Sequence, residues 1–148
     1  MKFITVTMLT LCLASLRSNA QNNPDAIIGK WASTEGNLIV EIYKEGFTYQ
    51  GKLIWFDNSD KKDIPLNERL DEKNPIQAFR TRKLKGLKVL QDLSYNQKDK
   101  RYEHGVIYDG NSGKTWNASV WFENNNFLKV RGFWHFECLG HSLSLKKI

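Results

Sequence analysis

Apolar and polar residues alternate along most of the chain from residue 27 onward, and no segment keeps the periodicity of a helix. Strict alternation is typical of a β-strand that packs one face on a core. Short turn sequences separate the alternating runs, as in Lys44-Glu45-Gly46 and in the Asp109 to Gly113 segment. The pattern therefore predicts an all-β protein.

The alternating runs number about eight, and most are joined by tight turns, so sequential neighbours should pair as antiparallel strands. A sheet of that size leaves two unpaired edges unless it closes on itself. We therefore expect an antiparallel meander or closed barrel, whose interior can hold one small ligand. The expected strands lie around residues 27–31, 38–42, 47–55, 87–93, 102–108, 116–122, 128–134 and 139–148.

Residues 57–87 interrupt this pattern and carry Pro65, Pro75 and most of the charged clusters. Asn74 as a cap and Pro75 at the first helical position predict one helical turn that reaches Arg80. Long loops in compact domains are usually either functional or partly disordered. We expect an ordered flap across the barrel mouth or along its outer wall.

The first residues resemble a secretory signal peptide: Lys2 precedes an apolar run over residues 3–16, and Ser18 and Ala20 are small residues just before a cleavage site ahead of Gln21. This pattern predicts a signal peptide at residues 1–20, a single domain at 21–148, and a periplasmic or extracellular location. The run is too short for a comfortable membrane span, so a retained anchor is the weaker alternative.

Charge argues against nucleic acid as a partner. The whole chain has 22 Lys and Arg against 16 Asp and Glu, and residues 1–20 hold two of the basic residues and no acidic one, so the mature chain keeps a net charge of +4. The basic residues are spread along the chain and interleaved with acidic ones, without the basic stripe of a nucleic-acid-binding module.

Catalytic residues are not evident in the sequence. Cleavage removes Cys12 and leaves Cys138, so the mature chain has no internal disulfide. Cys138 and the three histidines, His104, His135 and His141, could meet in space, but they lack the spacing of a metal site. We expect no catalysis, metal or cofactor, and an enzyme built on this group is the last alternative. Acidic residues in the long loop are expected to serve solubility or turns: Asp57, Asp60, Asp71 and Glu72.

Five polar residues that a core does not require are the candidates for ligand binding: Asn74, Arg80, Tyr108, Asp109 and Arg131. Each also has a structural alternative, since Asn74 and Asp109 can cap turns and the arginines can form ion pairs. Arg80 is the preferred anchor because its guanidinium could hold a carboxylate or phosphate from the flap. The apolar residues expected to line the interior are Leu53, Trp55, Val89, Val106, Trp116 and Val130.

Several segments together resemble the bacterial domain-of-unknown-function 2147 family (DUF2147): Gly29-Lys30-Trp31; Asn74-Pro75 through Arg80, Leu84 and Gly86-Leu87; Gly105 to Asp109 with Gly113-Lys114; and Leu128 to Phe133 with Leu139-Gly140. The resemblance covers nearly the whole mature chain. It implies a lipocalin-like barrel of exported proteins without an established activity.

A structural role is expected for Trp31, which resembles the Trp at the base of lipocalin barrels, with Lys147 as its basic cover. The family glycines are expected to be structural as well: Gly29, Gly86, Gly105, Gly113 and Gly132.

The sequence thus leaves two main functions open. The first is a barrel that binds a small amphipathic or anionic molecule. The alternative is an interaction protein of the cell envelope, in which Trp121, Phe133 and Trp134 form a surface for another protein or a cell-wall polymer.

Overall fold

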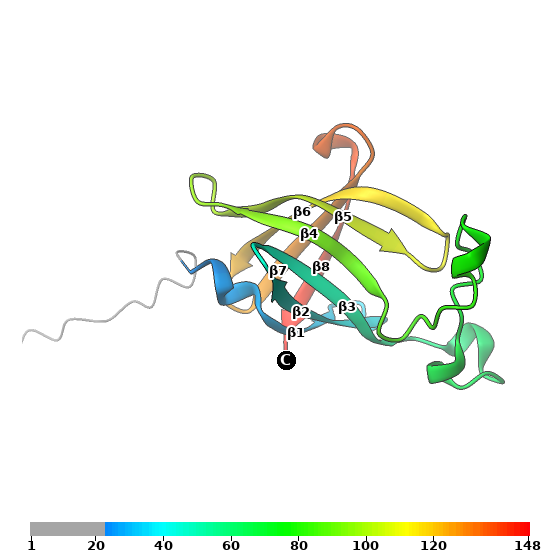
Figure 1. Cartoon of the computed structure of the whole chain (residues 1–148). Coiled ribbons are helices and arrows are strands. Elements are labelled where there is room, and N and C mark those ends of the chain that lie inside the picture. Colours follow the sequence, from blue (N-terminus) through cyan, green and yellow to red (C-terminus); the bar gives the residue numbers. More distant parts are fainter. Residues whose placement is uncertain (1–22) are drawn as a thin grey trace, which may run out of the picture.

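The computed structural model describes residues 23–148, so the predicted signal peptide and its cleavage site lie outside the described residues. Within this range eight antiparallel strands follow one another around a closed barrel (Figure 1). None of the described helices is long and apolar enough to cross a membrane. The strands are β1 (Gly29–Ser33), β2 (Leu38–Glu45), β3 (Thr48–Phe56), β4 (Lys88–Asn96), β5 (Arg101–Asp109), β6 (Lys114–Asn124), β7 (Phe127–Phe133) and β8 (His141–Lys147).

The barrel closes where β1 pairs with β8, with Trp31 opposite Lys147 and Ser33 opposite Leu145. This pairing leaves neither terminal strand with a free edge. The predicted closed antiparallel barrel of about eight strands is therefore confirmed.

An aromatic core fills one end of the barrel. The short 3-10 helix η2 (Pro24–Ile27) covers that end, at the left of Figure 1. Trp31 is fully buried and donates from Nε1 to the Ile27 carbonyl at 2.8 Å. Tyr102 donates to the Pro24 carbonyl at 2.6 Å, and Tyr49 donates to Asp25 at 2.6 Å. These hydrogen bonds fix η2 over the closed end.

Two β-bulges change which residues of β4 and β5 face inward. Asp92 and His104 have φ of 57° and 61°, a left-handed conformation that is uncommon outside glycine. In β5 the extra residue lies between Tyr102 and Gly105, which pair with Val120 and Ala118. The bulge shifts the alternation, so Ile107 and Asp109 line the interior cavity and Val106 does not.

Gly105 allows this bulge to pack tightly. A Cβ atom at Gly105 would collide with the Leu93 side chain and the Gln91 carbonyl oxygen. On the neighbouring strand β3, the side-chain N–H of Gln50 donates to the Asp92 carboxylate at 3.0 Å, and the side-chain oxygen of Gln50 accepts from the Asp92 N–H at 3.1 Å. The paired bulges are thus fixed by packing and by hydrogen bonds.

The end of β3 contains a further irregularity. Ile39 pairs with Trp55 but Val40 pairs with Leu53, so β3 carries one extra residue there. Phe56 therefore faces the interior, as Leu53 does before the irregularity, while Trp55 lies on the outside and is exposed.

The 57–87 segment is ordered and lies at the end of the barrel opposite η2, in green in Figure 1. It contains three short 3-10 helices, η3 (Ser59–Lys61), η4 (Leu66–Glu68) and η5 (Gln77–Phe79). The predicted turn is present but begins later, at Gln77, and Asn74 accepts a hydrogen bond from the Ile76 N–H at 2.9 Å. An isolated bridge between Leu70 and Lys83 joins the two halves of the segment.

Candidate functional site

A cavity of about 590 Å³ occupies the half of the barrel that faces the 57–87 segment. Its volume lies within the range of small-molecule sites, about 300–1,000 Å³. Four of the six predicted lining residues do line it: Leu53, Val89, Trp116 and Val130. Trp55 and Val106 do not, because the bulges of β3 and β5 turn them outward. Further apolar side chains complete the wall: Leu38, Val40, Phe56, Leu84, Leu90, Ile107, Leu143 and Leu145.

Polar side chains line the mouth of this cavity, from the ends of β3 and β5 and from η3. Asp57 accepts hydrogen bonds from the Ser59 N–H and hydroxyl at 3.0 and 2.9 Å. Asp109 accepts in the same way from the Asn111 N–H at 2.9 Å and the Ser112 hydroxyl at 2.7 Å. Each carboxylate is therefore held by its own turn beside an apolar interior.

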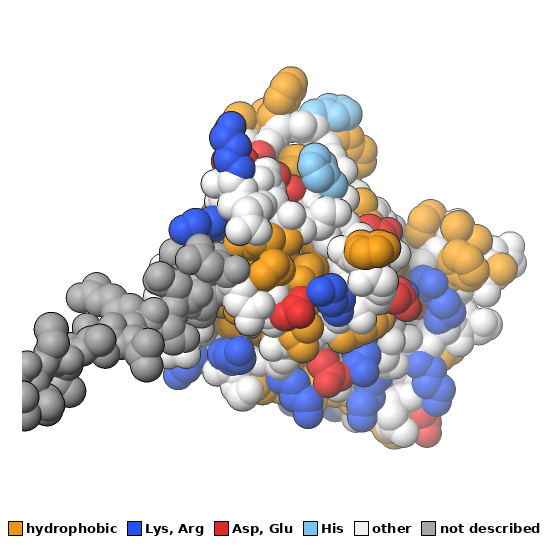
Figure 2. All heavy atoms as spheres, turned by 60° about the vertical axis from the view of Figure 1, so that its left-hand side comes forward, with side chains coloured by type: hydrophobic (Ala, Val, Ile, Leu, Met, Phe, Trp, Pro, Cys, Tyr) orange, Lys and Arg blue, Asp and Glu red, His pale blue; other side chains and the backbone are white. Residues whose placement is uncertain are grey.

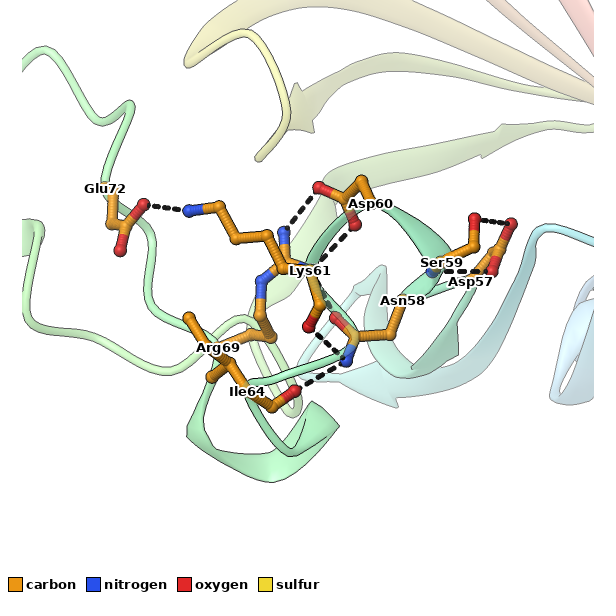
Figure 3. Close-up of polar contacts among 8 residues, drawn as sticks. All are labelled: Asp57, Asn58, Ser59, Asp60, Lys61, Ile64, Arg69 and Glu72. Atoms are coloured by element: carbon orange, nitrogen blue, oxygen red, sulfur yellow. Dashed lines mark hydrogen bonds and ion pairs between the residues drawn. The ribbon is translucent and has the colours of Figure 1, made fainter.

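A buried arginine supports the part of the mouth formed by η3 (Figure 3). The Arg69 side chain is 7% exposed and donates to both carboxylate oxygens of Asp60, at 2.9 and 3.1 Å. Arg69 also donates to Asn58, whose amide donates to the Ile64 carbonyl at 2.7 Å. Hydrogen bonding from Arg69 holds the pKa of Asp60 below its ordinary value, so this carboxyl is ionised at neutral pH.

A second polar network, buried except for Arg82, attaches the 57–87 segment to β5. Asp71, which has no exposed surface, accepts from the Tyr108 hydroxyl at 2.5 Å and from Asn74 and Arg82, each at 2.8 Å. The Asn74 amide also donates to the Tyr108 oxygen at 3.1 Å. Burial, together with the hydrogen bond to Asp71, raises the pKa of Tyr108 to about 12. The expectation that Asp71 serves solubility or a simple turn is wrong, because its carboxylate is the centre of this network.

The five predicted ligand residues are thus divided among four places. Tyr108 and Asp109 line the cavity, and Asn74 contacts Tyr108 in the buried network. Arg80 is exposed, does not line the cavity, and donates from Nε to the Asn74 carbonyl at 2.8 Å. The expectation that Arg80 anchors a ligand over the barrel mouth is wrong, because Arg80 does not belong to the cavity lining.

Arg131 also lies away from the cavity, because Val130 faces inward and its neighbour must face outward. Its guanidinium donates to the Glu137 and Cys138 carbonyls and, at 2.8 Å, to the Ser142 hydroxyl. Arg131 therefore holds the connection between β7 and β8, which contains the 3-10 helix η6 (Glu137–Leu139).

Sequence reasoning missed the carboxylates at the cavity mouth other than Asp109. Asp57 and Asp60 line the cavity, whereas the sequence assigned them only to solubility or to turns. The position of Asp57 directly after an alternating run was the one available signal, since the end of a barrel strand lies at a mouth. Nothing in the sequence indicated the path by which Asp60 returns to the opening.

The predicted structural residues occupy the following positions. The Lys147 ammonium lies 5.4 Å from the centre of the Trp31 ring. Gly113 has φ of 71°, and a Cβ there would collide with the Lys73 carbonyl of the 57–87 segment. A Cβ at Gly132 would lie 3.3 Å from the side chain of Ile107, which is two strands away in the barrel. Gly29 and Gly86 have positive φ values, in the region that favours glycine.

A separate basic hollow lies outside the cavity, between the 57–87 segment and the barrel wall. Asn74 and Tyr108 reach it, as does Phe79, whose ring stacks on the Arg82 guanidinium at 4.4 Å. Its charged residues are all basic: Arg82, Lys83, Lys85 and Lys88.

Exposed apolar side chains are concentrated on the connection between β7 and β8. Trp134, Phe136 and Leu139 are 63%, 67% and 79% exposed. Figure 2 shows hydrophobic and histidine side chains gathered over this connection, at the top of the view. Trp121, expected on an exposed surface, is instead partly buried with Arg101 stacked over its ring at 4.4 Å.

Cys138 is exposed on η6, between His135 and His141, while His104 lies at the bulge of β5. Among residues 23–148, no three His, Cys, Asp or Glu side chains are placed to bind a metal ion.

Comparison with known proteins agrees with this architecture. The chain is similar in structure to protein HP1028 from the human pathogen Helicobacter pylori, which is described as belonging to the lipocalin family. The two are 21% identical, the match covers 82% of each chain, and the TM-score is 0.68. This likeness shows the lipocalin-like fold. No curated protein matches the chain.

The model of one protein family, described as uncharacterized proteins conserved in bacteria, matches residues 29–147, which run from the first strand of the barrel to the last. The chain therefore belongs to this family, DUF2147.

Proposed function

We propose that this protein is exported to the periplasm or the cell exterior and that its barrel binds a small amphipathic molecule without catalysing a reaction. The observation that carries the proposal is the cavity of about 590 Å³, apolar in its interior and polar at its mouth. A site of this kind buries the apolar part of a ligand and orients it through a few polar groups.

The closed and open halves of the barrel support different roles. The closed half is filled by the side chains of Trp31, Tyr49 and Tyr102, which also donate hydrogen bonds to η2. The closed half therefore stabilises the fold. In the open half most of the apolar inward side chains are aliphatic, such as Val40 and Val89, and the cavity lies between them. A molecule with an apolar body would pack against these side chains and remove its own apolar surface from water.

A fluorescent probe tests this proposal directly. Phenylnaphthylamine is uncharged at neutral pH and emits strongly only in apolar surroundings, so its emission should rise on binding and fall when decanol displaces it. Val89→Trp places an indole inside the cavity and should abolish binding. Val106→Trp is the matched control, because Val106 lies outside the lining, and it should leave binding unchanged. Equal binding by both variants would contradict the proposal.

An anionic ligand would need a different place. The cavity lining contains no Lys or Arg, and the predicted anchor Arg80 does not belong to it. The basic hollow around Arg82 and Lys85 is the surface on which an anionic molecule could bind. Extraction of the protein purified from its host would show which class of molecule it carries.

An interaction with a protein or polymer of the cell envelope is the second candidate. It is favoured by the exposed side chains of Trp134, Phe136 and Leu139, since clustered apolar groups on a surface often mark a contact site. Replacing all three with Ser should abolish capture of an envelope partner in a pull-down while phenylnaphthylamine binding persists. Loss of probe binding without loss of a partner would contradict this second candidate.

A further inference from the structure

The charge along the cavity mouth is entirely of one sign. Asp57, Asp60 and Asp109 line the cavity, and no Lys, Arg or His does. Asp60 is compensated by the buried guanidinium of Arg69 (Figure 3). Among the ion pairs of residues 23–148, none includes Asp57 or Asp109. Two uncompensated carboxylates therefore stand beside a large apolar space.

Both uncompensated carboxylates are held in place and keep acceptor capacity. In Asp57 one oxygen accepts the Ser59 N–H and the other accepts the Ser59 hydroxyl. In Asp109 the two oxygens accept from Asn111 and Ser112 in the same arrangement. A carboxylate offers about four lone-pair positions, so each oxygen retains room for another donor. The turns thus orient both groups before any ligand arrives.

The position of Asp109 depends on the bulge at His104. Without that extra residue, the alternation from Tyr102 would direct residue 108 into the barrel and residue 109 outward. With the bulge, the Asp109 carboxylate reaches the mouth, and Tyr108, which also lines the cavity, donates its hydroxyl to Asp71. Pairing of β5 with both neighbouring strands around the bulge fixes this arrangement.

We infer that the molecule bound in this barrel is an amphipathic cation, with an apolar body in the cavity and a protonated amine between Asp57 and Asp109. This inference rests on the proposed function and specifies its ligand class. An ammonium group supplies donors and positive charge to both carboxylates. A fatty acid would instead bring a third uncompensated carboxylate to the mouth, where like charges repel.

Three competitors with the same hydrocarbon chain separate charge from apolar contact: decylamine, decanol and decanoate, each below its micelle concentration. Displacement of phenylnaphthylamine from the unmodified protein should follow the order amine, alcohol, acid. Asp57 is exposed and Asp109 is partly exposed. Charge pairs at such positions contribute about 1.4-fold to fivefold in affinity each, so two of them predict about a twofold to thirtyfold preference for the amine over the alcohol. High salt should reduce this preference.

Variants then assign the preference to particular residues. Asp57→Asn and Asp109→Asn keep an acceptor for the local turn but delete the charge. Each variant should lower the affinity for decylamine about twofold to fivefold and change the affinity for decanol by less than about twofold. Asp63→Asn, an exposed residue outside the lining, is the control and should change neither.

The outcomes distinguish this inference from the proposed function. If the probe binds and Val89→Trp abolishes binding, but decylamine competes no better than decanol or decanoate, the ligand class is wrong and the binding barrel stands. If the Asn variants lose equal affinity for decylamine and for decanol, the proposed role of the carboxylates is also wrong. If the probe does not bind at all, the proposed function itself fails.

Discussion

Replacing Tyr108 with Phe should loosen the 57–87 segment from the barrel. The change removes one oxygen atom and leaves the ring in place. That oxygen donates to the buried carboxylate of Asp71 at 2.5 Å and accepts from Asn74 at 3.1 Å. Asp71 has no exposed surface, so water cannot replace the lost donor without local opening.

The expected loss of stability follows from the charge of the Asp71 carboxylate, which accepts the hydrogen bond. A hydrogen bond to a charged group contributes about 1.5–3 kcal/mol, roughly twice the contribution of a neutral one. Asp71 retains the donors of Asn74 and Arg82, each at 2.8 Å, which limits the damage. We therefore expect the free energy of unfolding to fall by about 2 kcal/mol, and Tm by about 6–10 °C for a domain of this size.

Denaturant unfolding and limited proteolysis measure the two parts of this prediction. Unfolding reports the free energy, and proteolysis reports whether cleavage begins within residues 57–87. Tyr43→Phe is the matched control, because Tyr43 is a partly exposed tyrosine on β2 outside the network, and its effect should be within about 0.5 kcal/mol. If Tyr108→Phe costs no more than this control and cleavage in the segment is unchanged, the network does not hold the segment.

Three further predictions concern other parts of the fold. Burial raises the pKa values of Tyr49, Tyr102 and Tyr108, so these neutral hydroxyl groups stabilise the folded state below about pH 10. The free energy of unfolding, measured by denaturation at a series of alkaline pH values, should therefore fall from about pH 10 toward 12 and above. A free energy that does not change over this range would contradict the burial of these tyrosines. Gly113→Ala should lower the free energy of unfolding by at least about 1 kcal/mol in a chemical denaturation series, because φ is 71° and the added methyl meets the 57–87 segment. Arg131→Ala should speed amide exchange in η6 yet leave phenylnaphthylamine affinity within twofold, and a larger loss of affinity would place this arginine at the cavity after all.

The strands and their closure were predictable because they follow from a local rule. Alternation identifies an inward face wherever a strand is regular, and sequential pairing with tight turns determines the strand order. The side chains of Leu53, Trp116 and Val130 lie inside for that reason, whereas Val89 lies at a register shift between β3 and β4. No long-range information was needed for this part of the fold.

The bulges were not predictable from alternation. Asp92 and His104 adopt positive φ without being glycine, and the sequence around them continues to alternate. A single extra residue reverses the faces that follow it, which is why Val106 was expected inside and Ile107 was found there. Gly105 beside the bulge was the one local signal, since a Cβ there would collide with Leu93.

The path of the 57–87 segment was the other source of error. Its hydrogen bonds join residues that are distant in sequence, such as Asp71 with Tyr108 and Arg69 with Asp60. Composition indicated a polar loop but not which carboxylate would be buried. Arg80 was consequently expected at the mouth, although the ordered path of the segment places it outside the cavity lining.

The most direct test of the central claim is native mass spectrometry of the mature protein purified from its own host. The account predicts a stoichiometric small-molecule adduct that disappears on denaturation, is absent from Val89→Trp and is retained by Val106→Trp. Identification of the extracted molecule would also give its charge. An unliganded mass for the unmodified protein, or an adduct that survives in Val89→Trp, would contradict the claim that this cavity binds the ligand.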